Sequence, residues 1–224
     1  IALEQLNLSN NQLTSLDVSS NTALTILRCN NNQLTSLDVS NNTLLEELNC
    51  ADNQLTSLDV SNNTDLSDLR CYSNQLTTLD VSLNIALLTL YCEGNDLTSL
   101  DVSSNTALGS LSCAVNQLTS LDVSNNVDLY KLYCDHNELT TLDVSSNTAL
   151  NAELRCNNNQ LTYLNMRNGV TDALTTFDAT DNLLTCIETL DSDYADSAWT
   201  NTNGNIDAGV TFDFICGSEA VTHW

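Results

Sequence analysis

The sequence predicts a mainly β fold, a parallel solenoid in which each coil contributes two short strands and helix is scarce. Two observations predict it. Leucine recurs at an unbroken spacing of 21 residues from Leu3 to Leu150, and the next repeat opens at Leu174 after 24 residues. In both halves of each repeat, apolar residues alternate with polar ones, which is typical of short strands with one buried face.

The repeat unit has the form L-x-x-L-x-C-x-x-N-x-L-T-S-L-D-V-S-x-N-x-x. Its second half repeats the apolar spacing of its first half, so each coil consists of two similar half-coils of 10 and 11 residues. Each half is long enough for one strand and too short for a useful helix. We therefore expect strands on two faces, with stacking of neighbouring coils supplying the stability that a single coil lacks.

This unit resembles the leucine-rich repeat, in particular the short, nested 21-residue repeats of secreted bacterial proteins known as the IRREKO class. The resemblance covers about residues 1–185, in eight or nine tandem copies. It implies a right-handed leucine-rich-repeat solenoid of about nine coils over residues 1–185. Residues 186–224 would then form a C-terminal capping segment, and the protein would be secreted or held on a bacterial cell surface.

Three residue types recur in columns along the repeat. An amide at the turn after each strand can satisfy backbone groups that the bend leaves unpaired, so both asparagine columns are interpreted as structural. The cysteines occupy an inward position and lack the clustered spacing of zinc ligands, which favours buried thiols that act as small apolar residues. The cysteine column contains Cys29, Cys50, Cys71, Cys92, Cys113, Cys134 and Cys156.

Two cysteines, Cys186 and Cys216, lie outside this column and bracket an acidic tail. The tail resembles the terminal segments of secreted bacterial leucine-rich-repeat proteins, a likeness that rests on these cysteines with Trp199 and Phe214. We predict a disulfide between Cys186 and Cys216 that closes the cap, which fits an oxidising compartment.

The charge of the chain limits its partners. With 29 acidic and 5 basic residues, the formal net charge is −24. Such a surface repels phosphate backbones and anionic lipid, so nucleic acid is not an expected partner. No stretch approaches the 18 apolar residues of a membrane span, so membrane insertion is not expected either, and we expect a monomer.

A column of outward aspartates runs through the second halves, where neighbouring carboxylates repel one another. A solvated stripe and a row of bound cations both remain open, although a flat row offers few of the six to eight oxygens that Ca²⁺ takes. No resident cofactor is predicted. The weak calcium candidates are Asp59, Asp80, Asp101 and Asp122.

The outward positions of the first halves vary from coil to coil, and four of the five basic residues lie there. Tyrosine and arginine are frequent at binding hot spots, because arginine pairs with carboxylates through two hydrogen bonds and tyrosine stacks on sugar or peptide. In the resembled family, this strand lines the concave ligand surface. We expect a binding or adhesion scaffold for a protein or glycan, with ligand contacts at Arg28, Arg70, Tyr72, Tyr91, Tyr133, His136 and Arg155.

Two other classes of function compete with binding. The regular Thr/Ser/Asp face could order water, ice or ions as a structural solenoid, but its charge differs from the flat uncharged faces that bind ice. An enzyme is not expected, because only His136 and His223 are present and no nucleophile, zinc-protease or phosphate-loop motif occurs.

Overall fold

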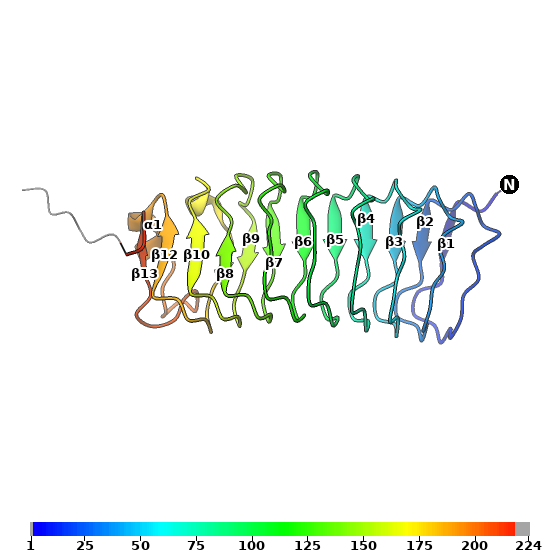
Figure 1. Ribbon diagram of the computed structural model, residues 1–224, viewed down its shortest axis with the longest axis horizontal. Coiled ribbons are helices and arrows are strands. Elements are labelled where there is room, and N and C mark those ends of the chain that lie inside the picture. The colour runs from blue at the N-terminus through cyan, green and yellow to red at the C-terminus, as the bar shows by residue number, and fades with distance from the viewer. Residues whose placement is uncertain (1, 218–224) are drawn as a thin grey trace, which may run out of the picture.

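The computed structural model describes residues 2–217, which form a stack of parallel coils with the N-terminal coil at one end and the cap at the other (Figure 1). Within residues 2–217, helix is limited to α1 (Ser192–Ala198) and the short 3-10 turn η1 (Thr171–Ala173). The predicted mainly β parallel solenoid is confirmed.

The first halves of the coils form one continuous nine-stranded parallel sheet, here called the first sheet. Equivalent positions of consecutive repeats pair in register, so that Leu27 faces Leu48 and Arg28 faces Asn49. A fixed repeat length makes this register inevitable, because any slip would expose the inward leucines. The strands are β1 (Gln5–Asn7), β2 (Ile26–Arg28), β3 (Glu47–Asn49), β4 (Asp68–Arg70), β5 (Thr89–Tyr91), β6 (Ser110–Ser112), β7 (Lys131–Tyr133), β9 (Glu153–Arg155) and β11 (Thr176–Asp178).

The second halves pair regularly only near the C-terminal end. There, β8 (Thr141–Asp143), β10 (Tyr163–Met166), β12 (Cys186–Thr189) and β13 (Thr211–Asp213) form a four-stranded parallel sheet. In the earlier described coils, this half is extended but carries no regular strand. The second predicted strand therefore forms where the repeats depart from the 21-residue spacing: β8 and β10 pair Thr141 with Tyr163, 22 positions later.

Leucine, cysteine and valine fill the interior of every coil. In the coil that opens at Leu45, the side chains of Leu45, Leu48, Cys50, Leu55 and Val60 are fully buried. The column cysteines are all buried free thiols, as predicted. Burial raises their pKa values, that of Cys29 to about 12, which keeps them protonated and apolar in character.

Both asparagine columns bind backbone groups across the coil boundary. Asn53 accepts a hydrogen bond from the N–H of Leu34 and donates to the carbonyls of Cys29 and Cys50. In the second column, Asn63 donates to the carbonyls of Val39 and Asn42 in the preceding coil. These contacts hold each turn against its neighbour, so both columns are structural.

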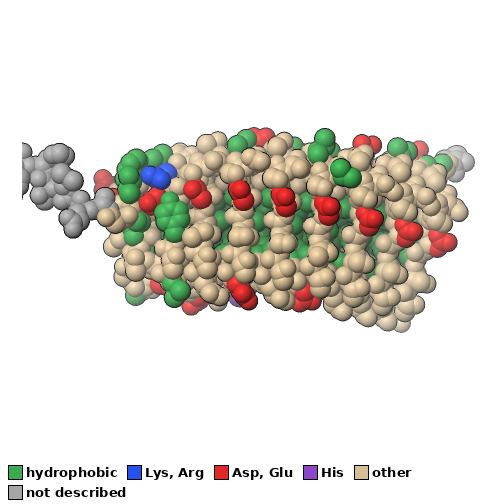
Figure 2. Space-filling model, viewed as in Figure 1, with side chains coloured by type: hydrophobic (Ala, Val, Ile, Leu, Met, Phe, Trp, Pro, Cys, Tyr) green, Lys and Arg blue, Asp and Glu red, His purple; other side chains and the backbone are tan. Residues whose placement is uncertain are grey.

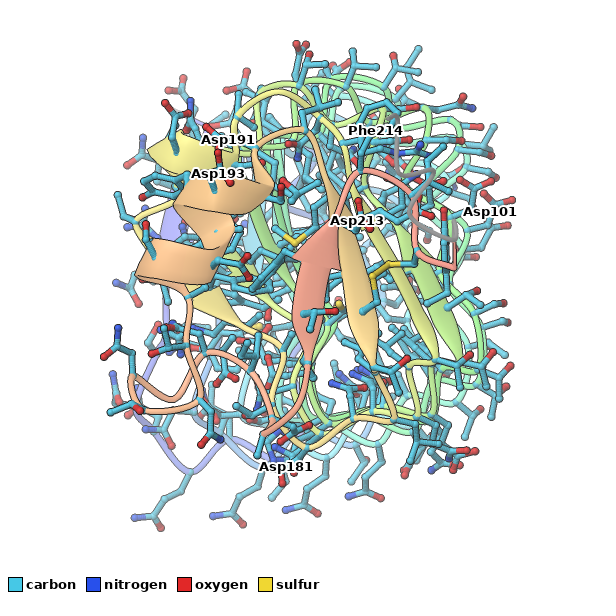
Figure 3. All side chains as sticks on the ribbon, turned by 90° about the vertical axis from the view of Figure 1, so that its left-hand side faces the viewer. Asp101, Asp181, Asp191, Asp193, Asp213 and Phe214 are labelled. Atoms are coloured by element: carbon cyan, nitrogen blue, oxygen red, sulfur yellow. A yellow bond between two sulfur atoms is a disulfide. The ribbon has the colours of Figure 1, made fainter. Side chains whose placement is uncertain are left out.

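The C-terminal segment closes the end of the core, seen face-on in Figure 3. Trp199, which follows α1, packs against Phe177 and Phe212 with ring centres 4.5 and 5.9 Å apart. The predicted disulfide between Cys186 and Cys216 is present, with the two Cα atoms 5.8 Å apart. Since β12 begins at Cys186 and pairs with β10, the coil pattern continues into this segment, and the division at residue 185 stays a prediction.

Candidate functional site

The face built from the second halves is uniform and acidic, and a row of acidic side chains runs along it in Figure 2. Each aspartate of the column accepts a hydrogen bond from the backbone N–H of the serine two residues later, at 2.9 Å for Asp59 and Asp101. The side chain and N–H of Ser61 lower the pKa of Asp59 below its ordinary value. The column is therefore a repeated turn contact.

The calcium candidates Asp59, Asp80, Asp101 and Asp122 all lie exposed in this row. Between residues 2 and 217, no three or more His, Cys, Asp or Glu side chains are grouped so that they could hold a metal ion. A shallow hollow beside Asp80 and Asp101 is lined by hydroxyl groups of neighbouring coils. A solvated stripe and a row of bound cations both stay open for these aspartates.

The outer surface of the first sheet carries the variable residues. Arg28, Arg70, Tyr91, Tyr133 and Arg155 are the last residues of β2, β4, β5, β7 and β9, so they occupy one column in register. Tyr72 and His136 follow in the turns after β4 and β7. The seven predicted ligand contacts thus lie on one face or in the turns beside it, in five of its coils.

The arginines of this face already have carboxylate partners inside the molecule. Arg28 binds Glu47 through two hydrogen bonds of 2.6 and 2.9 Å, and Arg70 binds Asp68 at 2.9 and 2.8 Å. All five basic side chains of the chain are ion-paired in this way. The guanidinium forks of Arg28 and Arg70 are therefore occupied, whereas Arg155 approaches Glu153 through one nitrogen at 3.4 Å. The face offers aromatic rings among paired charges.

The densest group, the Tyr133 cluster, consists of Lys131, Tyr133, Glu153 and Arg155. The Tyr133 hydroxyl donates to Glu153, and Lys131 and Arg155 approach the same carboxylate at 2.9 and 3.4 Å. Both cations also flank the Tyr133 ring, 5.0 and 4.9 Å from its centre. Hydrogen bonds from Tyr133 and then Lys131 lower the pKa of Glu153. The ring is held in one orientation before any partner arrives.

A second group surrounds Tyr91. The guanidinium of Arg70 lies over the Tyr91 ring, 5.6 Å from its centre. The Tyr91 hydroxyl is 3.1 Å from the hydroxyl of Ser110 on β6. Next to it, Glu93 has an enclosed Oε2 without a hydrogen-bond partner, and burial raises its pKa. Of the other predicted contacts, Tyr72 is half-buried, while His136 is exposed and bonds Asp135 at 2.9 Å.

Three residues of this face, Lys131, Glu153 and Glu93, are not among the ligand contacts that the sequence predicts. The missing signal is a spacing: the last residue of one strand contacts the first residue of the next, as in Arg28 with Glu47, 19 positions later. In a chain with a 21-residue repeat, residues 19 positions apart are diagonal neighbours on the first sheet. A search of the sequence for oppositely charged residues at this spacing would find such pairs.

A family model described as "Leucine Rich repeats (2 copies)" matches residues 1–42. The functional domain of InlJ from Listeria monocytogenes, described as including a cysteine ladder, is 39% identical over 84% of this chain and 44% of its own, with a TM-score of 0.78. The chain is built of leucine-rich repeats. A leucine-rich-repeat protein of Leptospira interrogans is 26% identical, over 82% of this chain and 50% of its own, with a TM-score of 0.73.

The internalin InlF of L. monocytogenes shares the leucine-rich-repeat fold at 21% identity and a TM-score of 0.63, over 86% of this chain and 64% of its own. This chain spans less than two thirds of each of these three proteins. No curated protein matches it in sequence. Among its described residues, the only α-helix is far too short to cross a membrane.

Proposed function

We propose that this chain is a non-enzymatic protein-binding module of a secreted or surface-held bacterial protein of the nested 21-residue class. Its binding surface is the variable strip, defined as the first-sheet side chains from Arg70 to Arg155. The leucine-rich-repeat architecture and the internalin neighbours support the scaffold role. The disulfide supports an extracellular location.

One observation carries the proposal: the Tyr133 ring is fixed between two cations and a shared carboxylate. A tyrosine that only decorates an exposed strand does not require two cations and a carboxylate around its ring. Pre-organised aromatic side chains lose little conformational entropy on binding, and this smaller entropic cost raises affinity at protein interfaces. A protein partner is favoured over an acidic ligand, since every cation of the strip already has a carboxylate.

The test is a binding screen with the whole chain on an array of extracellular protein domains and an array of glycans. The variants Tyr91→Ser and Tyr133→Ser use a residue that the chain itself carries at this position, Ser112, so the fold should be retained. We expect each variant to weaken a protein hit by about tenfold or more, as at a hot spot.

The matched control is Thr78→Ser on the acidic face, where serine stands at the same position in other coils, such as Ser57 and Ser99. It should leave binding unchanged. A hit that survives both tyrosine variants, or that occurs on glycans alone, would overturn the proposal.

A further inference from the structure

Exposed apolar side chains gather along one edge of the stack, in the turns that lead from the second half of a coil into the next strand of the first sheet. Leu83, Ile85, Leu88, Val127 and Tyr130 are each 46–63% exposed. They form what we call the edge patch. Equivalent positions in other coils are polar: Thr64 and Thr106 match Ile85, and Ser67 matches Leu88.

One column of the edge patch runs without a polar side chain through three coils, whereas in the neighbouring column the exposed Thr106 separates Ile85 from Val127. Leu88, Gly109 and Tyr130 occupy the same position of consecutive repeats, and their backbones are joined by hydrogen bonds of 3.0 and 2.8 Å. A Cβ atom on Gly109 would lie 3.0 Å from the Tyr130 ring. The glycine therefore lets this ring lie against the backbone, and no side chain stands between Leu88 and Tyr130 in this column.

The turns that carry the patch are fixed. Asn84, Asn105 and Asn126 are buried, and each donates to a carbonyl of the asparagine one coil earlier at 2.8–2.9 Å. A surface held in this way need not be ordered by its partner, which lowers the entropic cost of binding. The patch also adjoins the variable strip, because Leu88 precedes β5 and Tyr130 precedes β7.

The charges at the margins indicate the occupant. Equivalent positions of four consecutive turns hold Asp65, Ala86, Ala107 and Asp128. The two alanines are therefore flanked along the stack by one exposed carboxylate at each end. The nearby Lys131 is neutralised by Glu153. A second copy of this chain, with a net charge of −24, would be repelled. A polypeptide with apolar side chains flanked by lysine or arginine complements both features.

We propose that the edge patch docks an apolar, basic polypeptide segment of the partner protein, which extends from the variable strip over the edge at Leu88 and Tyr130. This inference rests on the proposed function, because it assigns a partner class to a surface continuous with the strip.

The experiment selects random peptides displayed on phage against the intact chain and measures the affinity of the winners by calorimetry. The key variant combines Ile85→Thr, Leu88→Ser, Val127→Thr and Tyr130→Ser. Each change introduces a residue found at the equivalent exposed position of another coil, so the core and ladder are untouched. The matched control, Leu183→Gln, removes an exposed leucine elsewhere, at a position where other coils carry Gln12 and Gln33.

We expect apolar, basic peptides that bind the edge variant about tenfold or more weakly than the wild type and the control. Asp65→Asn with Asp128→Asn should reduce the salt dependence of binding. Selection of acidic peptides, equal binding to the edge variant, or a wild-type dimer that the variant loses would overturn the inference. Peptides sensitive only to Tyr91→Ser and Tyr133→Ser would overturn it and leave the proposed function standing.

Discussion

The guanidinium of Arg155 lies 4.9 Å from the centre of the Tyr133 ring, and both residues contact the carboxylate of Glu153. An aromatic ring, two cations and one carboxylate therefore act as a unit on the first sheet. The ring is therefore expected to move only together with its three charged neighbours.

Tyr133→Phe should raise the pKa of Glu153 toward its ordinary value, because the Tyr133 hydroxyl contributes most to lowering it. Carbon-13 NMR of the glutamate carboxyls during a pH titration would measure the shift. Tyr163→Phe is the control, since the Tyr163 hydroxyl donates to Glu188 instead. An unchanged midpoint for Glu153 in Tyr133→Phe would show that the hydroxyl does not hold this carboxylate.

Glu93→Gln should stabilise the protein near neutral pH by about 1 kcal/mol, because it removes the charge of a carboxylate whose Oε2 is enclosed without a hydrogen-bond partner. Burial raises the pKa of Glu93, so the folded state favours the protonated form. The loss of folding free energy caused by ionised Glu93 is absent below the pKa of the unfolded chain, about 4.3. It is complete once the pH has risen through the higher pKa of the folded state. Thermal melts across this range, with the exposed Glu46→Gln as control, would detect it. A gain independent of pH would contradict this account.

Val115→Asn should stabilise the fold by about 1 kcal/mol, because a β-branched residue is strained in the left-handed region. Val115 has φ 52°, and the equivalent Asn31 has φ 58°. Chemical denaturation of the two forms would measure the difference. The reciprocal change Gly94→Val, at the same position with φ 66°, should be destabilising by a similar amount. If neither change alters stability, the turn relaxes more readily than its geometry indicates.

Replacing both Cys186 and Cys216 with alanine should destabilise the C-terminal cap by about 3 kcal/mol, the usual effect of a disulfide across a separation of 30 residues. Hydrogen exchange should quicken around α1 and β13 while the central coils stay protected. Iodoacetamide should label only this pair in the reduced, folded wild type, since the column thiols are buried and protonated. Labelling of Cys92 or Cys113 without denaturant would contradict the sealed core.

Calcium and magnesium chloride at equal ionic strength should shift the melting temperature equally, because the exposed aspartates form a row and each already engages a serine. General screening then relieves their repulsion. The comparison needs only EDTA-treated protein and two salts. A larger shift with calcium, abolished by Asp80→Asn with Asp101→Asn, would instead establish a cation site.

The sequence was sufficient for the fold because its signal is periodic: one register satisfies every leucine, cysteine and asparagine column at once. It was also sufficient for the disulfide, since Cys186 and Cys216 break the period. It did not reveal that regular pairing of the second halves begins only at β8, because LTSLDVSxN is nearly identical in coils with and without a strand.

The site was less predictable. Composition located the variable strip and the residues Tyr91, Tyr133 and Arg155 on it. Arg70 and Arg155 pair with acidic residues two positions earlier in their own strands, a spacing that the sequence does contain. The contacts of Arg28 and Tyr133 with the acidic residue of the next strand are diagonal contacts between coils, which a one-dimensional reading of outward positions does not contain. The enclosure of Glu93 likewise depends on the side chains that cover it.

The hydrogen bonds of the second asparagine column all run in one direction along the stack. Asn63, Asn84 and Asn105 all donate backward, to the coil on their N-terminal side. A pulling force along the axis would therefore meet nearly the same set of bonds at each boundary. Coils should detach one after another, each releasing about 70–75 Å of extended chain, so that the domain would lengthen in equal steps under load.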